Sequence, residues 1–234
     1  MKTLGVIGGL GPMATVYFLE LITKLEEVDS DQQHMRIIME SIPDTPDRTA
    51  YILDHNNANP LPLLIESGNR LKKIGAEYFA IPCVTAHYFY DLLCKEIGLP
   101  IVSIPEELGR EFCEQGITKV GLLATSGTIY TNFLQKELGK NNIDVIIPDD
   151  IEQNTIMSII YDEIKAGKSP SIEKFLDVGN HLKHRGAEKL ILGCTELSLI
   201  KKDYSEVLSE DYVDSLEVLA KAAIRFNHLK IKEN

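Results

Sequence analysis

The chain has 234 residues and a formal net charge of −11, with 44% hydrophobic and 25% charged residues. This composition is typical of a folded globular protein, and the negative charge disfavours nucleic acid and anionic lipid surfaces as partners. No segment approaches the run of about 18 uncharged apolar residues that a membrane span requires, and no cleavable signal pattern is present. We therefore expect a cytoplasmic protein that binds neither nucleic acid nor membrane.

Short aliphatic runs alternate with helix-length segments along the whole chain. The runs predicted to be strands span residues 4–7, 36–40, 78–81, 101–103, 120–124, 145–147 and 189–192. Because these runs are uniformly apolar, we expect them to be buried on both faces, as in a parallel sheet between helices. The predicted fold class is α/β with mostly parallel sheets.

Capping residues and glycines mark the helices between these strands. Helices are predicted from Asn59-Pro60 to Gly75, from Thr128 to Leu138, from Asp149 or Asp150 to Ala166, and from Ser169-Pro170 to Gly186. A last amphipathic helix is predicted over Val213–His228 and must pack back on a sheet.

Two segments of the chain resemble each other. Residues 75–85 and 186–196 both read Gly-Ala-Glu, an apolar strand, and then a cysteine near a threonine. This favours two related halves, with chance similarity of two βα units as the alternative. Ligands bind beyond the carboxyl ends of parallel strands, so we expect Cys83 and Cys194 to face each other across one cleft.

Two facing thiols can invert a carbon centre. One, as thiolate, removes a proton and the other returns a proton to the opposite face. An ordinary cysteine has a pKa of about 8.5, and we expect the backbone N–H groups after each cysteine to lower it. Hydroxyls expected to bind a substrate carboxylate belong to Thr85, Thr195, Ser126 and Thr128. For either cysteine alone core packing is the alternative, but the repeated pair favours catalysis.

The other cysteines carry no such context. Cys94 and Cys113 lie in helical segments, and we expect both to be structural. The four cysteines show no CxxC and no close Cys/His pairing, so neither a disulfide framework nor a metal site is predicted.

Three motifs resemble the signatures of the aspartate/glutamate racemase family: GGLGPMAT at 8–15, IPCVTAH at 81–87 and LGCTEL at 192–197. The resemblance covers essentially the whole chain. It implies cofactor-independent racemisation of a small acidic amino acid, aspartate first and glutamate second, with Cys83 and Cys194 as paired bases. It also implies a homodimer.

The same resemblance implies two pseudo-symmetric Rossmann-like domains with the active site in the cleft between them. The first comprises residues 1–98 plus 212–234 and carries Cys83. The second, residues 99–211, carries Cys194 and is inserted into the first.

Further site residues follow from the resemblance. Arg48, in SIPDTPDRT at 41–49, is expected to bind the side-chain carboxylate through its planar fork, and Lys165 is expected to supply a second cation. A solvated loop charge for Arg48 and an ordinary helix-end lysine for Lys165 are the alternatives. Gly9 and Met13 of the first motif are also expected at the substrate.

One position departs from the family pattern. Val84 stands where the family usually has an Asn that helps to hold the substrate, and one such contact is worth roughly 1.5–3 kcal/mol. The substitution therefore bears on the identity of the substrate and not on the fold. His87 is expected either to orient groups near Cys83 or to pack in a helix, and Glu196 either to cap a helix or to contact the substrate ammonium. Asp214-Ser215 resembles a pair that approaches the cleft.

Other functions remain open. Gly9, Gly11 and Ala14 satisfy a loose dinucleotide-binding pattern, with Glu40 ending the next strand, although Pro12 removes one N–H from the helix start. A related isomerase or decarboxylase, such as a maleate isomerase or hydantoin racemase, is a second alternative. A non-catalytic binder of acidic amino acids is a third.

Overall fold

The computed structural model describes residues 1–232, whose strands form two sheets. The first has the order β2-β1-β3, with β1 at Leu4–Gly8, β2 at Ile37–Ser41 and β3 at Tyr78–Ala80. The second has the order β5-β4-β6-β7, with β4 at Lys119–Ala124, β5 at Asp144–Ile146, β6 at Lys189–Gly193 and β7 at Tyr212–Asp214. Neighbouring strands pair in parallel, which confirms the predicted fold class.

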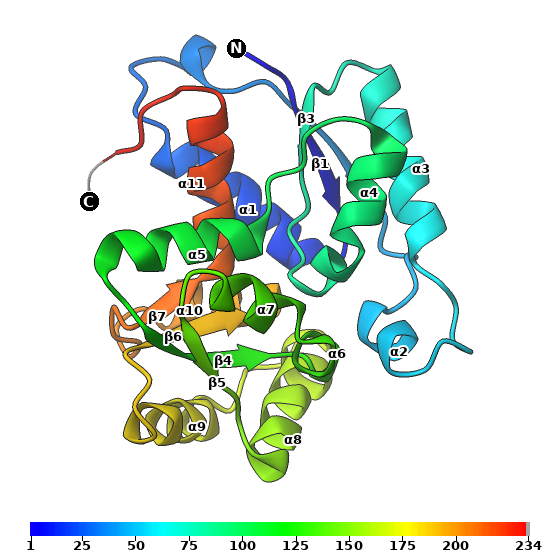
Figure 1. Ribbon diagram of the computed structural model, residues 1–234. Helices are drawn as coiled ribbons and strands as arrows, with labels where there is room; N and C mark the ends of the chain where they lie inside the picture. Colours follow the sequence, from blue (N-terminus) through cyan, green and yellow to red (C-terminus); the bar gives the residue numbers. More distant parts are fainter. Residues whose placement is uncertain (233–234) are drawn as a thin grey trace.

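Helices surround and connect the sheets, which occupy the upper and lower parts of Figure 1. In the first part of the chain they are α1 (Pro12–Leu25), α2 (Arg48–Leu53), α3 (Leu61–Lys73), α4 (Tyr90–Ile97) and α5 (Ile104–Gln115). They continue with α6 (Ser126–Thr131), α7 (Phe133–Gly139), α8 (Asp150–Ser158), α9 (Ile172–His184), α10 (Thr195–Asp203) and α11 (Ser215–Phe226). Two 3₁₀ turns, η1 (Asp31–Gln33) and η2 (Thr85–Phe89), and a π-helical turn, η3 (Ile159–Ile164), complete the set.

Four predicted elements differ in detail. The strand predicted over 101–103 forms a single bridge from Ile101 to Phe79, because Ser103 already caps α5 by accepting the Glu106 N–H. The helix predicted over 128–138 breaks into α6 and α7 at Asn132, whose φ is +54°. After α8 the predicted helix continues as the wider turn η3. The last helix starts later than predicted, because Tyr212–Asp214 pairs with β6.

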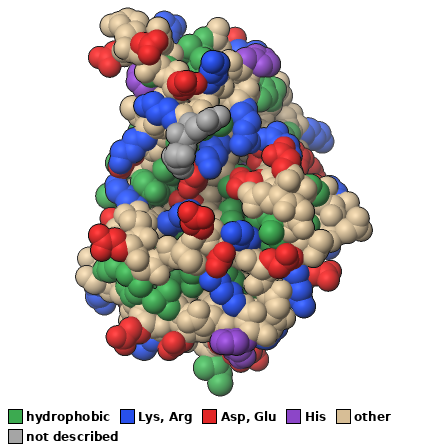
Figure 2. Space-filling view, turned by 90° about the vertical axis from the view of Figure 1, so that its left-hand side faces the viewer, with side chains coloured by type: hydrophobic (Ala, Val, Ile, Leu, Met, Phe, Trp, Pro, Cys, Tyr) green, Lys and Arg blue, Asp and Glu red, His purple; other side chains and the backbone are tan. Residues whose placement is uncertain are grey.

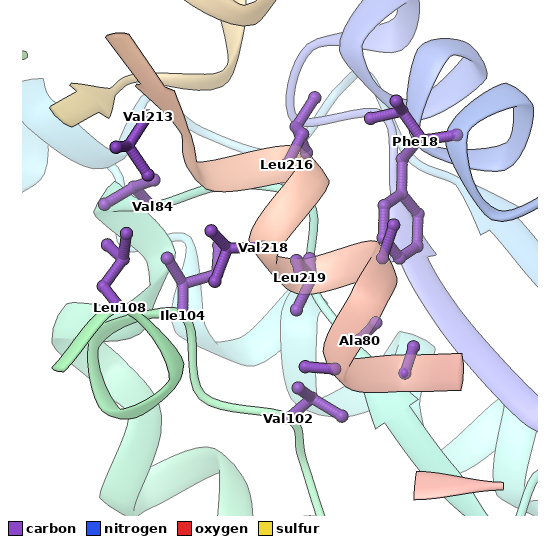
Figure 3. Packing of buried hydrophobic residues seen from close by; sticks show 14 of the residues in the cluster. Phe18, Ala80, Val84, Val102, Ile104, Leu108, Val213, Leu216, Val218 and Leu219 are labelled. Atoms are coloured by element: carbon purple, nitrogen blue, oxygen red, sulfur yellow. The ribbon is translucent and has the colours of Figure 1, made fainter. Parts of the chain in front are cut away.

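Helix α11 joins the two halves of the molecule. It packs against α1 and α5, and one buried cluster contains Leu219 of α11, Phe18 of α1 and Leu108 of α5 (Figure 3). The same cluster continues to Val6 of β1 and Val120 of β4. The division into residues 1–98 plus 212–234 and 99–211 stays a prediction, with the difference that β7 belongs to the second sheet.

The surface is charged but mixed. Figure 2 shows basic and acidic side chains interspersed over one face of the molecule. Within residues 1–232, no helix combines the length and the apolar character that crossing a membrane takes.

Candidate active site

Two buried thiols line one small chamber. Cys83 follows β3 in a tight turn, where its N–H donates to the Ile81 carbonyl at 2.7 Å. Cys194 directly follows β6 and precedes the first residue of α10. Each is 5% exposed, and the chamber that both line holds about 10 Å³, roughly room for one water molecule.

Most predicted site residues lie on this chamber or on the cavity beside it. The chamber wall includes Arg48, Cys83, Val84, Thr85, Lys165, Cys194, Thr195 and Glu196. Gly9 and Met13 line an adjoining cavity of about 490 Å³. The chamber and the larger cavity share Leu10, Asp47, Arg48, Lys165 and Glu196. The larger cavity therefore directly adjoins the chamber that the two thiols line.

Two predicted hydroxyls lie elsewhere. The Ser126 hydroxyl accepts a hydrogen bond from Gln153 at 3.2 Å. The Thr128 hydroxyl lies 3.1 Å from that of Thr85 and 3.2 Å from that of Thr125. Thr125, which directly follows β4, takes the place on the chamber wall that we predicted for its neighbours.

Arg48 is buried, and the residue is 7% exposed. Its terminal nitrogens donate to the carbonyl oxygens of Leu10 at 2.7 Å, Pro46 at 3.1 Å and Thr45 at 3.3 Å. Its Nε makes no hydrogen bond within residues 1–232. Burial alone would lower the pKa of Arg48, but the negative charges around it, including Asp47 and Glu196, outweigh burial and raise the pKa. Arg48 thus presents a fixed positive charge to the chamber.

Lys165 lies between two carboxylates. Its Nζ is 3.7 Å from Asp47 Oδ2, 4.0 Å from Glu196 Oε1 and 4.2 Å from the centre of the Tyr161 ring. Burial opposes the charged form, yet the negative charges of the Glu196 and Asp47 carboxylates raise the pKa of Lys165. The pKa of Asp47 is lowered, because the Ala50 N–H, Lys165 and Arg48 outweigh its desolvation.

Cys194 differs from the expectation for its pKa. Burial and then the charge of Glu196 raise the pKa of Cys194 well above its usual value. The backbone N–H of Glu196 and the charge of Lys165 act in the predicted direction but are outweighed. The Cys194 thiol donates to Glu196 Oε2 at 3.0 Å, so the prediction of a lowered pKa is wrong for this cysteine.

His87 hydrogen-bonds the backbone of Cys83. The Ile104 N–H donates to His87 Nε2 at 3.2 Å, so Nδ1 carries the proton and donates to the Cys83 carbonyl at 2.9 Å. Burial lowers the pKa of His87, and the ring is neutral. It links the turn that carries Cys83 to the start of α5.

Val84 belongs both to the chamber wall and to the hydrophobic core. It lines the chamber, and with 1% exposure it also belongs to the buried cluster that contains Leu108 and Val213 (Figure 3). Its methyl groups fill core space, so the side chain packs well where the family usually places an amide.

Asp214 and Ser215 fasten β7 and α11 and lie outside the residues that line the two cavities. Asp214 accepts from Ser198 Oγ at 2.5 Å and from the Leu216 N–H at 2.8 Å. Ser215 Oγ donates to the Leu192 carbonyl at 2.6 Å. The structure assigns this pair to the scaffold.

Four polar members of the chamber wall are not among the predicted site residues: Asp47, Thr49, Thr125 and Tyr161. The sequence contains a signal for each of them. Asp47 and Thr49 flank Arg48, Thr125 follows a predicted strand, and Tyr161 lies one helical turn before Lys165.

The glycine-rich first turn has packing reasons of its own. Gly9 has a φ of +85°, and a Cβ there would lie 2.4 Å from the Ile42 nitrogen. A Cβ on Gly11 would lie 2.5 Å from Glu196 Oε1. The start of α1 therefore faces a carboxylate at the place where a dinucleotide phosphate would need to bind, which counts against that alternative.

One group of metal-ligand type lies at the start of α8. Atoms of Asp149, Glu152 and His181 lie within 4.8 Å of one another. Asp149 and Glu152 form the capping box of α8, and Glu152 also pairs with His181. This group is explained as a helix cap.

Comparison with known proteins identifies the family to which the fold belongs. The model of the Asp/Glu/Hydantoin racemase family matches residues 7–223. The broad specificity amino-acid racemase RacX of Bacillus subtilis is 26% identical over 94% of this chain and 96% of its own length. The structure of Picrophilus torridus aspartate racemase superposes with a TM-score of 0.84 and 28% identity over 99% of this chain and 96% of that one. A putative Asp/Glu racemase from Yersinia pestis gives a TM-score of 0.81 and 27% identity over 97% and 99%.

The fold and the matching sequence signatures define an isomerase, an amino-acid racemase of a kind that does not depend on pyridoxal phosphate. The chain belongs to the Asp/Glu/hydantoin racemase family.

Proposed function

We propose that this enzyme racemises an acidic amino acid, aspartate first and glutamate second, by proton transfer between Cys83 and Cys194. The observation that carries the proposal is that these two buried thiols, from the carboxyl ends of β3 and β6, line one chamber. One thiolate takes the α-proton and the opposite thiol donates a proton to the other face, so the pair ends with its charge exchanged and the substrate inverted. Arg48 and Lys165 supply positive charge beside the developing carbanion, as electrostatic stabilisation requires.

The test is exchange of the α-hydrogen in D₂O, followed by NMR with L- and D-aspartate and L- and D-glutamate. We expect exchange without added pyridoxal phosphate or metal, and its loss in both Cys83→Ala and Cys194→Ala. Cys113→Ala, which changes an exposed cysteine, serves as the control and should retain the wild-type rate. Exchange that survives either chamber substitution would defeat the two-base assignment, and a non-catalytic binder would leave the α-hydrogen in place.

A second candidate is a wider range of amino acids, as the name of the Bacillus subtilis relative describes for that protein. Nη1 of Arg48 donates to the backbone oxygens of Thr45 and Pro46, and Nη2 donates to that of Leu10. The Nη1/Nη2 pair is therefore not free for a side-chain carboxylate, which leaves the edge formed by Nε and the second Nη2 hydrogen. The cavity of about 490 Å³ beside the chamber offers space for a longer side chain. Adding methionine, glutamine and lysine to the NMR series separates the two candidates by which substrates exchange fastest.

Assembly and location complete the proposal. We propose a cytoplasmic homodimer, and the exposed Met13 and Val16 of α1 offer an apolar surface for a second copy. Light scattering of the purified protein measures the assembly: a mass near twice 26.2 kDa supports the dimer, and a monomer mass contradicts it.

A further inference from the structure

A buried carboxylate hydrogen-bonds one of the two thiols of the chamber. Cys194 donates to Glu196 Oε2 at 3.0 Å, and this carboxylate belongs to a residue that is 4% exposed. The buried guanidinium of Arg48 lines the same chamber, together with Cys83. A carboxylate beside a thiol stabilises the protonated form, whereas a guanidinium favours a thiolate.

We propose that Glu196 is a positioning residue that holds the shared proton of the thiol pair on Cys194, through the hydrogen bond from Cys194 Sγ to Glu196 Oε2. This rests on the proposed two-cysteine function. During one half of the cycle Cys83 takes the α-proton while Cys194 gives up its S–H proton to the substrate. The next turnover in the reverse direction, or proton exchange with water, returns the proton to Cys194 and its hydrogen bond to Glu196.

The Glu196 carboxylate has a second hydrogen-bond partner besides Cys194 and fits a space at the start of α1. Thr195 Oγ1 donates to Glu196 Oε2 at 3.4 Å. The other oxygen, Oε1, is buried without a hydrogen-bond partner within residues 1–232 and occupies the space that a side chain at Gly11 would fill, 2.5 Å from an ideal Cβ. Gly11 therefore leaves room at the start of α1 for this carboxylate.

Several other groups face Cys194. The Nζ atom of Lys165 lies 4.0 Å from Glu196 Oε1 and favours the thiolate, but it also contacts Asp47. Tyr161 lines the same chamber and is uncharged, because burial raises its pKa to about 12. The carboxylate is the charged group that hydrogen-bonds the Cys194 thiol, so it decides where the proton rests.

A preferred proton position has a kinetic consequence. The two enantiomers of a free amino acid have equal energies, so kcat/KM must be the same in both directions. If the proton rests on Cys194, the form of the enzyme with a Cys194 thiolate is the minor one. An enantiomer that binds productively only to this minor form has an apparent affinity reduced by the fraction of enzyme in that form. The enantiomer whose α-hydrogen faces Cys194 should therefore show the larger KM and, in proportion, the larger kcat.

The direct test measures the reactivity of Cys194 with iodoacetamide between pH 6 and 11, read by mass spectrometry in a Cys83→Ala background, which removes the coupled titration of the pair. We expect Glu196→Gln to move the Cys194 profile to lower pH and to make alkylation about tenfold faster at a pH below the midpoint, because more of the thiol is then ionised. The matched control is Glu26→Gln, since Glu26 is also buried and accepts the Met35 N–H at 2.9 Å. An unchanged profile in Glu196→Gln, or an equal change in Glu26→Gln, would overturn the proposal.

A second variant reaches the carboxylate without changing its charge. Gly11→Ala places a Cβ against Glu196 Oε1, and we expect it to push the carboxylate away from Cys194 and move the profile in the same direction. If Glu196→Gln does not fold, Gly11→Ala decides, and an unchanged profile there counts against the proposal.

The kinetic arm compares initial rates from both enantiomers. We expect the ratio of the two KM values to lie away from one in the wild type and to move towards one in Glu196→Gln, while the equilibrium constant stays at one. A ratio unaffected by Glu196→Gln contradicts the proposal. Alkylation of Cys194 does not depend on racemisation. If the protein racemises none of the amino acids tested, the proposed function is wrong, but the alkylation profile still shows whether Glu196 holds the proton on Cys194.

Discussion

At the scale of single residues, the chamber combines two cations and two carboxylates that are already paired within the protein. Lys165 lies between Asp47 and Glu196, and Arg48 is fixed by three backbone oxygens. Charges held in this way do not have to reorganise when a carbanion forms, which is the condition under which fixed charges stabilise a transition state best.

Arg48→Lys tests whether the reaction needs the fixed guanidinium group or only a positive charge at this position. Lysine keeps the charge, but its single nitrogen cannot replace the hydrogen bonds to the carbonyls of Leu10, Thr45 and Pro46. We expect the rate of α-hydrogen exchange to fall about 100-fold or more. Arg70→Lys, at an arginine that pairs with Glu40 away from the chamber, is the control and should keep the rate, whereas an unaltered rate in Arg48→Lys would show that charge alone suffices.

His87 gives the stability of the protein a pH dependence. Its pKa is lowered in the folded state by burial, so below the unfolded value of about 6.5 the unfolded chain binds the proton more readily. The stability is complete above about pH 6.5 and decreases as the pH falls towards the folded-state pKa, by at most about 1.4 kcal/mol per pH unit. Urea unfolding at pH 7.5 and 5.5 should show a smaller loss in His87→Gln than in the wild type.

The control for that measurement is His184→Gln, which replaces an exposed histidine of α9. It should lose as much free energy of unfolding between the two pH values as the wild type does. An equal loss in His87→Gln as well would mean that other groups cause the acid sensitivity.

At the scale of elements, the sequence is most informative where a strand is buried on both faces. The apolar runs of β1, β4 and β6 are predictable because no polar residue interrupts them, and the cysteines are predictable from their places at strand ends. The break of the predicted helix at Asn132 could not be anticipated from the sequence. Asn132 adopts the left-handed backbone conformation, which asparagine visits more readily than most residues but does not require. Strand β7 is three residues long and joins an existing sheet edge, so tertiary pairing rather than its own pattern decides it.

The residues of the chamber also divide into those that the sequence predicts and those that it does not. Strand-end residues can be placed without coordinates, because the carboxyl ends of parallel strands meet at one edge. Tyr161 and Asp47 meet through a contact between distant segments, and no local pattern specifies such a meeting. The resemblance supplies Arg48 and Lys165 but not the backbone oxygens that hold Arg48.

Leu219→Ala tests the role of α11 as the element that joins the halves. Leu219 is fully buried in the cluster shared by both sheets, and a Leu→Ala change of this kind costs about 2–5 kcal/mol. We expect that decrease in the free energy of unfolding by urea. Leu92→Ala, at a leucine of α4 that is 48% exposed, should cost less than about 0.5 kcal/mol, and similar values for both would refute the importance of this contact.

At the scale of the whole molecule, the chamber is closed between the halves. Its volume of about 10 Å³ is far below that of an amino acid, so substrate must enter through a movement that separates its walls. Contacts across the chamber oppose this movement. The Tyr161 hydroxyl donates to the Asp47 carboxylate at 3.1 Å, and the Thr85 hydroxyl lies 3.0 Å from that of Thr125.

Tyr161→Phe should shift the enzyme towards the open form. The substitution removes the hydrogen bond to Asp47 and keeps the ring beside Lys165, and the loss of one hydrogen bond worth about 0.5–1.5 kcal/mol corresponds to roughly two- to tenfold more opening. We expect Cys83 and Cys194 to react with a thiol reagent faster by the same factor, since one movement exposes both. Tyr130→Phe, at a tyrosine that is 69% exposed, controls for the loss of a hydroxyl. Acceleration of one cysteine alone would mean local fraying at that residue, and no acceleration would mean that Tyr161 does not hold the chamber closed.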